Sequence, residues 1–165
     1  MKGVVLAGGL GTRLLPMTKV VNKHLLDVFD EPMIHFPIRT LARAGIEDIT
    51  LVTGREIDQF RELLGTGEGL GVHLSYAQQE GEGGIADALM KAAPSIGEDR
   101  MAVILGDNLF EDDLSPYLEA FSRQPARAKR LLRRVPGEDA RQYRLATAEA
   151  DRILSRVEHP AHPPR

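Results

Sequence analysis

The chain has 165 residues, of which 42% are hydrophobic and 27% are charged. This length suits one α/β domain with a buried core and is too short for two ordinary domains, and the composition is that of a folded globular protein. A formal net charge of -3 gives no reason to expect nucleic acid or an anionic membrane as a partner. The absence of cysteine excludes disulfides and thiolate metal sites.

The first apolar run, residues 3–7, ends at Gly8, Gly9 and Gly11, which is typical of a buried parallel strand that opens into a loop. Its core of residues 4–7 is too short for a secretion signal or a membrane span, so we expect a cytoplasmic protein. Further strands are predicted at residues 48–53, 72–77 and 101–105.

Three helices are predicted between these strands, because apolar residues there recur on one helical face. The residues that define them are Ile34, Ile38 and Leu41 before Gly45, then Phe60, Leu63 and Leu64 before Gly65, and then Ile85, Leu89 and Ala92. We expect Pro94 to end the third helix. Alternating strands and helices predict βαβ units, and hence a mostly parallel α/β sheet with helices on both faces.

After about residue 118 the pattern weakens. Residues 143–148 and 153–157 alternate weakly between apolar and polar, which allows them to pair as strands. Residues 159–165 are rich in proline, which cannot donate to a sheet ladder. We therefore predict a single domain over residues 1–158, followed by a disordered tail at 159–165.

The loop after the first strand reads Gly8-Gly-Leu-Gly-Thr-Arg13. Its glycines let backbone N–H groups approach a phosphate closely, and Arg13 adds a cation that can fork onto phosphate oxygens. A dinucleotide fingerprint is excluded because Leu14 stands at the third glycine position, and a P-loop is excluded because no Gly-Lys-Ser or Gly-Lys-Thr follows. The alternative is a tight strand–helix connection without a ligand.

This loop, together with Lys23 in Asn-Lys-His-Leu-Leu at 22–26, resembles the signature of the sugar-1-phosphate nucleotidyltransferases, and among them those that transfer thymidylate to glucose 1-phosphate. The supporting stretches are Lys-Val-Val-Asn-Lys at 19–23, Pro-Met-Ile at 32–34, Tyr-Ala-Gln-Gln at 76–79, Gly-Ile-Ala at 84–86 and Leu-Gly-Asp-Asn at 105–108. The likeness is close to about residue 110 and fainter to residue 160. It implies a three-layer, Rossmann-like fold of the nucleotide-diphospho-sugar transferase type, in truncated form.

The resemblance implies that the chain condenses dTTP with glucose 1-phosphate, or a related sugar phosphate, and releases pyrophosphate. It assigns the triphosphate to Gly8, Gly11, Thr12 and Arg13. Arg13 is expected to neutralise the leaving pyrophosphate and Lys23 to reach the α-phosphate, and these two are the predicted catalytic residues. Outside this context, Lys23 is interpreted as an ordinary exposed lysine.

The resemblance also assigns the base and the metal. Gln79 is expected to pair with the pyrimidine edge, since an amide offers both a donor and an acceptor, and Gly84 to let the backbone approach the base. Thymine and uracil fit Gln79 equally. Asp107 is expected to bind Mg²⁺ at the end of the fourth strand, and the alternative is an aspartate that begins a turn.

The sequence departs from the family where the sugar phosphate is held. His159 stands in place of a lysine, and Arg144 stands in place of a glycine after Tyr143. The family also supplies a second metal-binding aspartate and most of the sugar pocket from a further C-terminal half. The alternative function is therefore a non-catalytic module that binds dTTP or UTP, or a half-enzyme that acts with a partner chain. Apolar surface left uncovered would favour a homo-oligomer.

Overall fold

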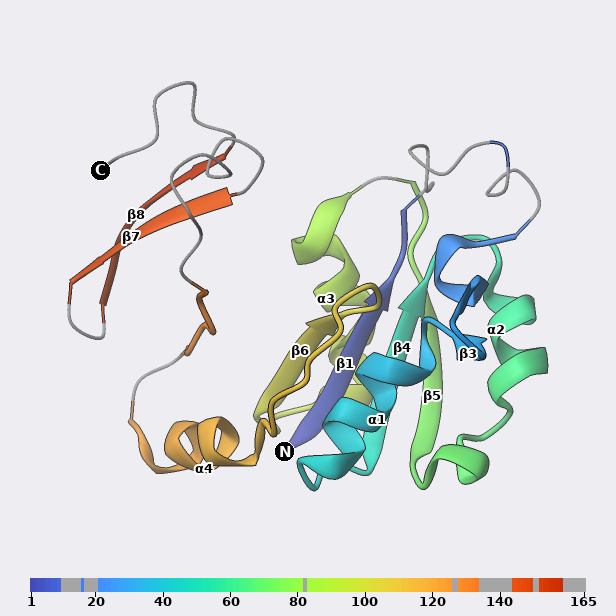
Figure 1. Cartoon of the computed structure of the whole chain (residues 1–165), viewed down its shortest axis with the longest axis horizontal. Coiled ribbons are helices and arrows are strands. Elements are labelled where there is room, and N and C mark those ends of the chain that lie inside the picture. The colour runs from blue at the N-terminus through green and yellow to red at the C-terminus, as the bar shows by residue number, and fades with distance from the viewer. Residues whose placement is uncertain are drawn as a thin grey trace. The chain divides into compact units, whose positions relative to one another are not determined.

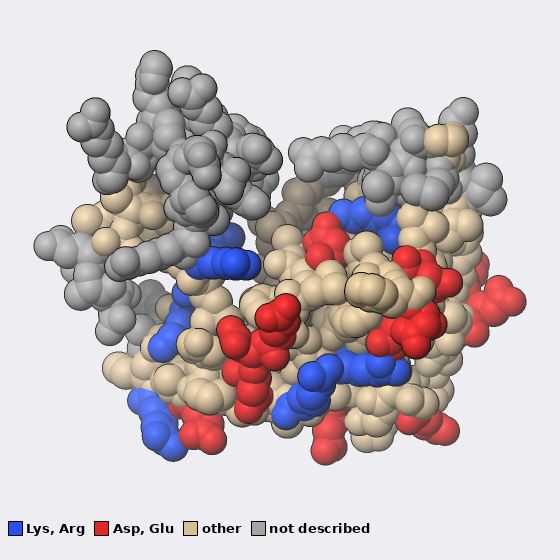
Figure 2. All heavy atoms as spheres, viewed as in Figure 1, with Lys and Arg blue, Asp and Glu red and all other residues tan. Residues whose placement is uncertain are grey.

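The computed structural model describes residues 1–9, 16, 21–81, 83–125, 128–133, 144–149 and 152–158. Two compact units form, Met1–Gln124 and Pro125–Arg165, and each is described by itself. The predicted single domain over 1–158 stays a prediction, and the predicted tail lies outside the described residues. Within the described ranges, no helix has the length and apolar character needed to cross a membrane. On the face shown in Figure 2, acidic and basic side chains are interspersed.

Four parallel strands form the central sheet of the first unit. They are β1 (Lys2–Ala7), β4 (Asp48–Thr53), β5 (His73–Gln78) and β6 (Met101–Leu105), in the order β5-β4-β1-β6 (Figure 1). Residues 3–7 of β1 are buried, because this strand has a neighbour on each side and side chains packed on each face. All four strands agree with the sequence predictions, with β5 beginning one residue later than expected.

Helices cover both faces of this sheet (Figure 1). Val5 of β1 packs in one cluster with residues of α1 (His35–Arg43) and α2 (Ile57–Leu64), namely Ile38 and Phe60. Val4 of β1 points to the other face and packs against Ala92 of α3 (Gly84–Ile96). Because successive strand residues face opposite ways, this division confirms the predicted three-layer α/β architecture.

The prediction that Pro94 ends the third helix is wrong, because α3 continues to Ile96. Proline removes the backbone hydrogen bond to the carbonyl four residues earlier, at Met90. Ile96 is nevertheless buried against β1 and β4, so the last turn gains apolar burial that offsets the lost bond. The helix ends at Gly97, whose N–H donates to the carbonyl of Ala93 at 2.9 Å.

Shorter elements complete the first unit. They are the 3-10 helices η3 (Lys23–Leu25) and η4 (Glu68–Leu70), the antiparallel pair β2 (Asp27–Val28) and β3 (Glu31–Pro32), and α4 (Ser115–Arg123). Asn22 caps η3, since its side-chain oxygen accepts a hydrogen bond from the backbone N–H of His24 at 3.0 Å. This cap stabilises the short helical turn that carries Lys23 and His24.

In the second unit, β7 (Arg144–Glu149) and β8 (Arg152–Glu158) form an antiparallel hairpin. The register shifts between Thr147 and Ala148, as in a β-bulge. The hairpin confirms the predicted pairing of the two weakly alternating segments.

Candidate functional site

A cavity of about 330 Å³ lies at the carboxyl ends of the parallel strands. The strand order reverses between β1 and β6, and ligands of open α/β sheets bind at such a switch point. The cavity-lining residues come from the ends of β1, β5 and β6, from η3 and from the start of α3. They are Leu6, Gly8, Gly9, Lys23, His24, Gln79, Gly81, Gly84, Ile85, Ala88, Leu105 and Asp107.

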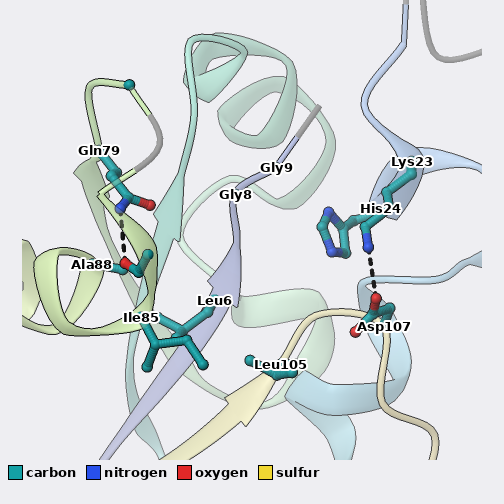
Figure 3. Close-up of a pocket in the computed structure, with 12 residues that line it drawn as sticks. Leu6, Gly8, Gly9, Lys23, His24, Gln79, Ile85, Ala88, Leu105 and Asp107 are labelled. Atoms are coloured by element: carbon teal, nitrogen blue, oxygen red, sulfur yellow. Dashed lines mark hydrogen bonds and ion pairs between the residues drawn. The ribbon is translucent and has the colours of Figure 1, made fainter. Parts of the chain in front are cut away.

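The two ends of the cavity differ in chemistry. In Figure 3, the charged pair Lys23 and Asp107 lies at one end and Gln79 at the other, with Leu6 and Ile85 near Gln79. Apolar walls with a few fixed polar groups are typical of sites for small molecules. This arrangement suits a ligand with an anionic end and a flat, partly apolar end.

Lys23 and Asp107 form an ion pair, with Nζ and Oδ2 2.6 Å apart. Gly106 leads into Asp107 by donating its N–H to the carbonyl of Leu6 at 2.8 Å, which extends the pairing of β1 and β6 by one residue. Burial acts to raise the pKa of Asp107, but the hydrogen bond and charge of Lys23 outweigh it and hold the pKa below its usual value. Asp107 is therefore an ionised carboxylate at neutral pH.

His24 is a cavity residue that sequence reasoning did not single out. It is 1% exposed, and its Nδ1 lies 2.7 Å from the side-chain oxygen of Asn22. That oxygen already accepts from the backbone N–H of His24, so Nδ1 must be the protonated nitrogen. Burial and, to a smaller extent, the charge of Lys23 lower the pKa of His24 to about 4, so the ring is neutral at pH 7.

Gly106 allows His24 to pack beneath the end of β6. A Cβ atom at position 106 would lie 2.7 Å from Cδ2 of His24 and 3.1 Å from the carbonyl oxygen of Leu6. Both distances are too short for ordinary packing, so a side chain here would displace the ring or the strand end. The glycine of the Leu-Gly-Asp-Asn stretch thus has a packing role that its sequence context does not reveal.

Gln79 follows β5 and connects it to the start of α3. Its backbone N–H donates to the carbonyl of Thr53 at 2.8 Å, and the residue is 9% exposed. Its Nε2 donates to the carbonyl oxygen of Gly84 and to Oδ2 of Asp87, each at 2.9 Å. Nothing in the sequence indicates Asp87, because the contact depends on how α3 returns to the sheet.

The structure brings the described predicted site residues together around one cavity. Lys23 and Asp107 meet at one end, and Gly8, Gln79 and Gly84 meet at the other. The remaining predicted residues Gly11, Thr12 and Arg13 lie outside the described residues, as do Tyr143, His159 and the side chain of Arg144. Among the described residues, no group of three or more His, Asp or Glu side chains is placed to hold a metal ion.

Comparison with known proteins finds relatives of the chain. Glucose-1-phosphate thymidylyltransferase of Mycobacterium tuberculosis (strain CDC 1551 / Oshkosh) is 50% identical over 111 residues, which are 67% of this chain and 38% of that protein. The enzyme of the same name from Neisseria meningitidis serogroup A is 47% identical over 111 residues, again 67% and 38%. The chain therefore spans about two fifths of the length of these relatives.

Solved structures share the fold. A Bacillus anthracis protein assigned as a glucose-1-phosphate thymidylyltransferase, crystallised with sucrose, aligns with a TM-score of 0.92 at 44% identity, over 99% of this chain and 66% of that one. A UDP-glucose pyrophosphorylase of Acinetobacter baumannii aligns with a TM-score of 0.80 at 28% identity, over 97% and 68%. The family model described as nucleotidyl transferase matches residues 2–165. Because this match runs through every strand and helix that builds the cavity, the chain belongs to the nucleotidyl transferase family.

Proposed function

We propose that this chain binds a pyrimidine nucleoside triphosphate, dTTP or UTP, in the cavity and transfers its nucleotidyl group to glucose 1-phosphate or a related sugar phosphate. The observation that carries the proposal is the cavity itself, with Lys23 and Asp107 at one end and Gln79 beside an apolar wall at the other. Identity of 50% to a glucose-1-phosphate thymidylyltransferase supports the choice of base and acceptor.

The transfer needs little from the protein beyond positioning and positive charge. An oxygen of the sugar phosphate attacks the α-phosphorus in line, and the bond from that phosphorus to the bridging oxygen of the β-phosphate breaks, releasing pyrophosphate. We assign Lys23 to the α-phosphate and Arg13 to the leaving pyrophosphate. Both cations offset charge that grows on phosphate oxygens as the bonds exchange.

Asp107 is the residue that we assign to Mg²⁺. Its carboxylate is ionised, its side chain is 41% exposed, and it stands at the strand end where the phosphates would lie. Mg²⁺ is commonly held by one or two carboxylates together with phosphate oxygens and waters, and it would neutralise phosphate charge. Lys23 is ion-paired with Asp107 in this structure. The proposal therefore requires Lys23 to leave this carboxylate and contact the phosphate when the ligand binds.

Titration of dTTP into the purified chain by calorimetry tests the proposal, with Mg²⁺ present, with and without glucose 1-phosphate, and with pyrophosphate assayed in the same cell. We expect binding in both cases and pyrophosphate release only with the sugar phosphate. Arg13→Ala should weaken dTTP binding, and Lys23→Ala and Asp107→Ala should each lower turnover by about 100-fold or more. Lys91→Ala, on the exposed side of α3, is the matched control and should change neither quantity. Absence of binding of both dTTP and UTP, each titrated in this way, would contradict the proposal.

The second candidate is a non-catalytic module that binds dTTP or UTP, or a half-enzyme that works with a partner chain. The observation in its favour is that Arg144 and His159 stand where the family has a glycine and a lysine. Binding of dTTP without pyrophosphate release would support it. Pyrophosphate release above the rate without protein, abolished by Lys23→Ala, would exclude it.

A further inference from the structure

Two residues of α3 hold the side-chain amide of Gln79 in one orientation. Its Nε2 lies 2.9 Å from the carbonyl oxygen of Gly84 and 2.9 Å from Oδ2 of Asp87. Both neighbours are acceptors only, and the amide nitrogen carries two N–H donors. Turning the amide over would place its oxygen against two other oxygens. The hydrogen-bonding chemistry therefore assigns nitrogen and oxygen without ambiguity.

Asp87 is itself held in place. It lies in the first turn of α3 and is half-buried. A Cβ atom at Gly83 would lie 2.7 Å from its Oδ2 and 2.6 Å from its Cβ, so the carboxylate rests directly on the backbone of residue 83. Only a residue without a side chain at 83 leaves room for this contact with Gln79.

The opposite end of the amide faces the strand end of β1. A Cβ atom at Gly8 would lie 3.2 Å from Oε1 of Gln79, and in Figure 3 this oxygen points toward Gly8 while the nitrogen points away. Gly8 lines the cavity. Gln79 therefore presents an acceptor on that side, because both of its donors are already occupied by Gly84 and Asp87.

Resting on the proposed function, we propose that Asp87 is a positioning residue that makes the cavity selective for a base that carries a hydrogen on N3. Thymine and uracil present N3–H, which can donate to Oε1 of Gln79. Cytosine presents a bare N3 lone pair, which would face the lone pairs of Oε1. A glutamine free to turn over would accommodate either base, so the discrimination depends on the contacts that hold the amide, and Asp87 is the one of the two that a side-chain substitution can change.

The test compares dUTP and dCTP, which differ only in the edge at positions 3 and 4 of the base. Calorimetric titrations at one Mg²⁺ concentration give the ratio of the two dissociation constants, and dTTP serves as the reference ligand for the proposed function. For the unmodified chain we expect dUTP to bind about 30-fold more tightly than dCTP, since an unpaired buried acceptor is costly.

Asp87→Asn has the same shape but can donate as well as accept, so only the carbonyl of Gly84 still opposes a turned amide. We expect the ratio to fall about tenfold, and affinity for dCTP to rise in absolute terms. If Asp87 had only a structural role, the substitution would weaken the binding of both nucleotides equally. Gly83→Ala, which displaces the carboxylate without removing its charge, should change the ratio in the same direction. Asp58→Asn is the matched control, since Asp58 lies in the first turn of α2 and is exposed.

Gln79→Leu tests whether Asp87 acts through the amide of Gln79. In that background, Asp87→Asn should leave the ratio unchanged, because Asp87 acts through the amide. Binding of dTTP with equal affinities for dUTP and dCTP would overturn this inference and leave the proposed function standing. An unchanged ratio in both Asp87→Asn and Gly83→Ala would also overturn it. Failure of the unmodified chain to bind any of the three nucleotides would overturn the proposed function and the inference with it.

Discussion

Two titratable side chains at the charged end of the cavity are each held in the form that has lost its proton. His24 is buried beneath Gly106, and burial lowers its pKa to about 4. Asp107 has a lowered pKa because the effect of Lys23 exceeds that of burial. A neutral imidazole beside Lys23 avoids repulsion between two positive charges in a partly buried site.

The lowered pKa of His24 predicts a defined loss of stability in mild acid. Well above pH 6.5 the histidine is neutral in both the folded and the unfolded chain. As the pH falls from 6.5 toward about 4, His24 becomes protonated in the unfolded chain but stays neutral in the folded chain. The free energy of unfolding should therefore fall by up to about 1.4 kcal/mol for each pH unit in this window.

Urea unfolding measured between pH 7.5 and 4.5 checks this, with His24→Gln compared with the unmodified chain. The difference in unfolding free energy between the two should change with pH, because the variant lacks the titrating group. His73→Gln is the control, since the side chain of His73 is 76% exposed. Parallel curves for His24→Gln and the unmodified chain would show that His24 titrates normally.

Single residues also show how far the sequence could predict this site. Lys23, Gln79 and Asp107 were predicted because each stands in a stretch that resembles a family signature. His24 and Asp87 were missed, because their importance comes from packing beneath Gly106 and from a contact with Gln79. No periodicity or spacing records such contacts, which exist only once the sheet has formed.

At the scale of elements, α2 and α3 end in the same way. Gly65 and Gly97 have φ values of 54° and 62° and ψ values of -129° and -131°, and each N–H donates to the carbonyl four residues earlier at 2.9 Å. This backbone region is closed to residues with a side chain. Glycine, rather than Pro94, therefore supplies the stop signal for α3, which explains why the proline misled the sequence prediction.

Gly97→Ala should lower the free energy of unfolding by about 1–3 kcal/mol, because alanine cannot adopt this backbone conformation without strain. Gly69→Ala is the control. A Cβ at position 69 meets nothing within 4 Å and the backbone there has no positive φ. Chemical unfolding of the two variants and the unmodified chain measures the difference. Equal stability of both variants would mean that the end of α3 relaxes at no cost.

At the scale of the whole molecule, β6 is the edge strand of the described sheet, and several of its apolar side chains are exposed to solvent. Met101, Val103 and Leu105 are 38%, 42% and 39% exposed. Their register places them on the same face as Val4 and Leu6 of β1. There α3 packs on β1 and β4. Exposed apolar edges are sites for association with another chain.

The homo-oligomer stays a prediction, for which this edge offers a surface, and the cytoplasmic location stays a prediction from sequence alone. Sedimentation velocity at rising protein concentration should show self-association, and Val103→Glu should weaken it, since a charge at an edge opposes pairing. Leu63→Glu is the control, because Leu63 is 45% exposed on α2, which packs on the opposite face. A monomer at the highest concentration would contradict the prediction.

The position of β1 between β4 and β6 also determines when the sheet can be completed during synthesis. β1 gains its second neighbour, β6, only after α1, β4, α2, β5 and α3 have been made. Lys23 can therefore pair with Asp107, 84 residues further along the chain, only after β6 has been made. Such non-local pairing is slow, and the cavity exists only when it is complete. A ligand that spans Gln79 and Asp107 should accordingly slow unfolding while leaving the folding rate unchanged.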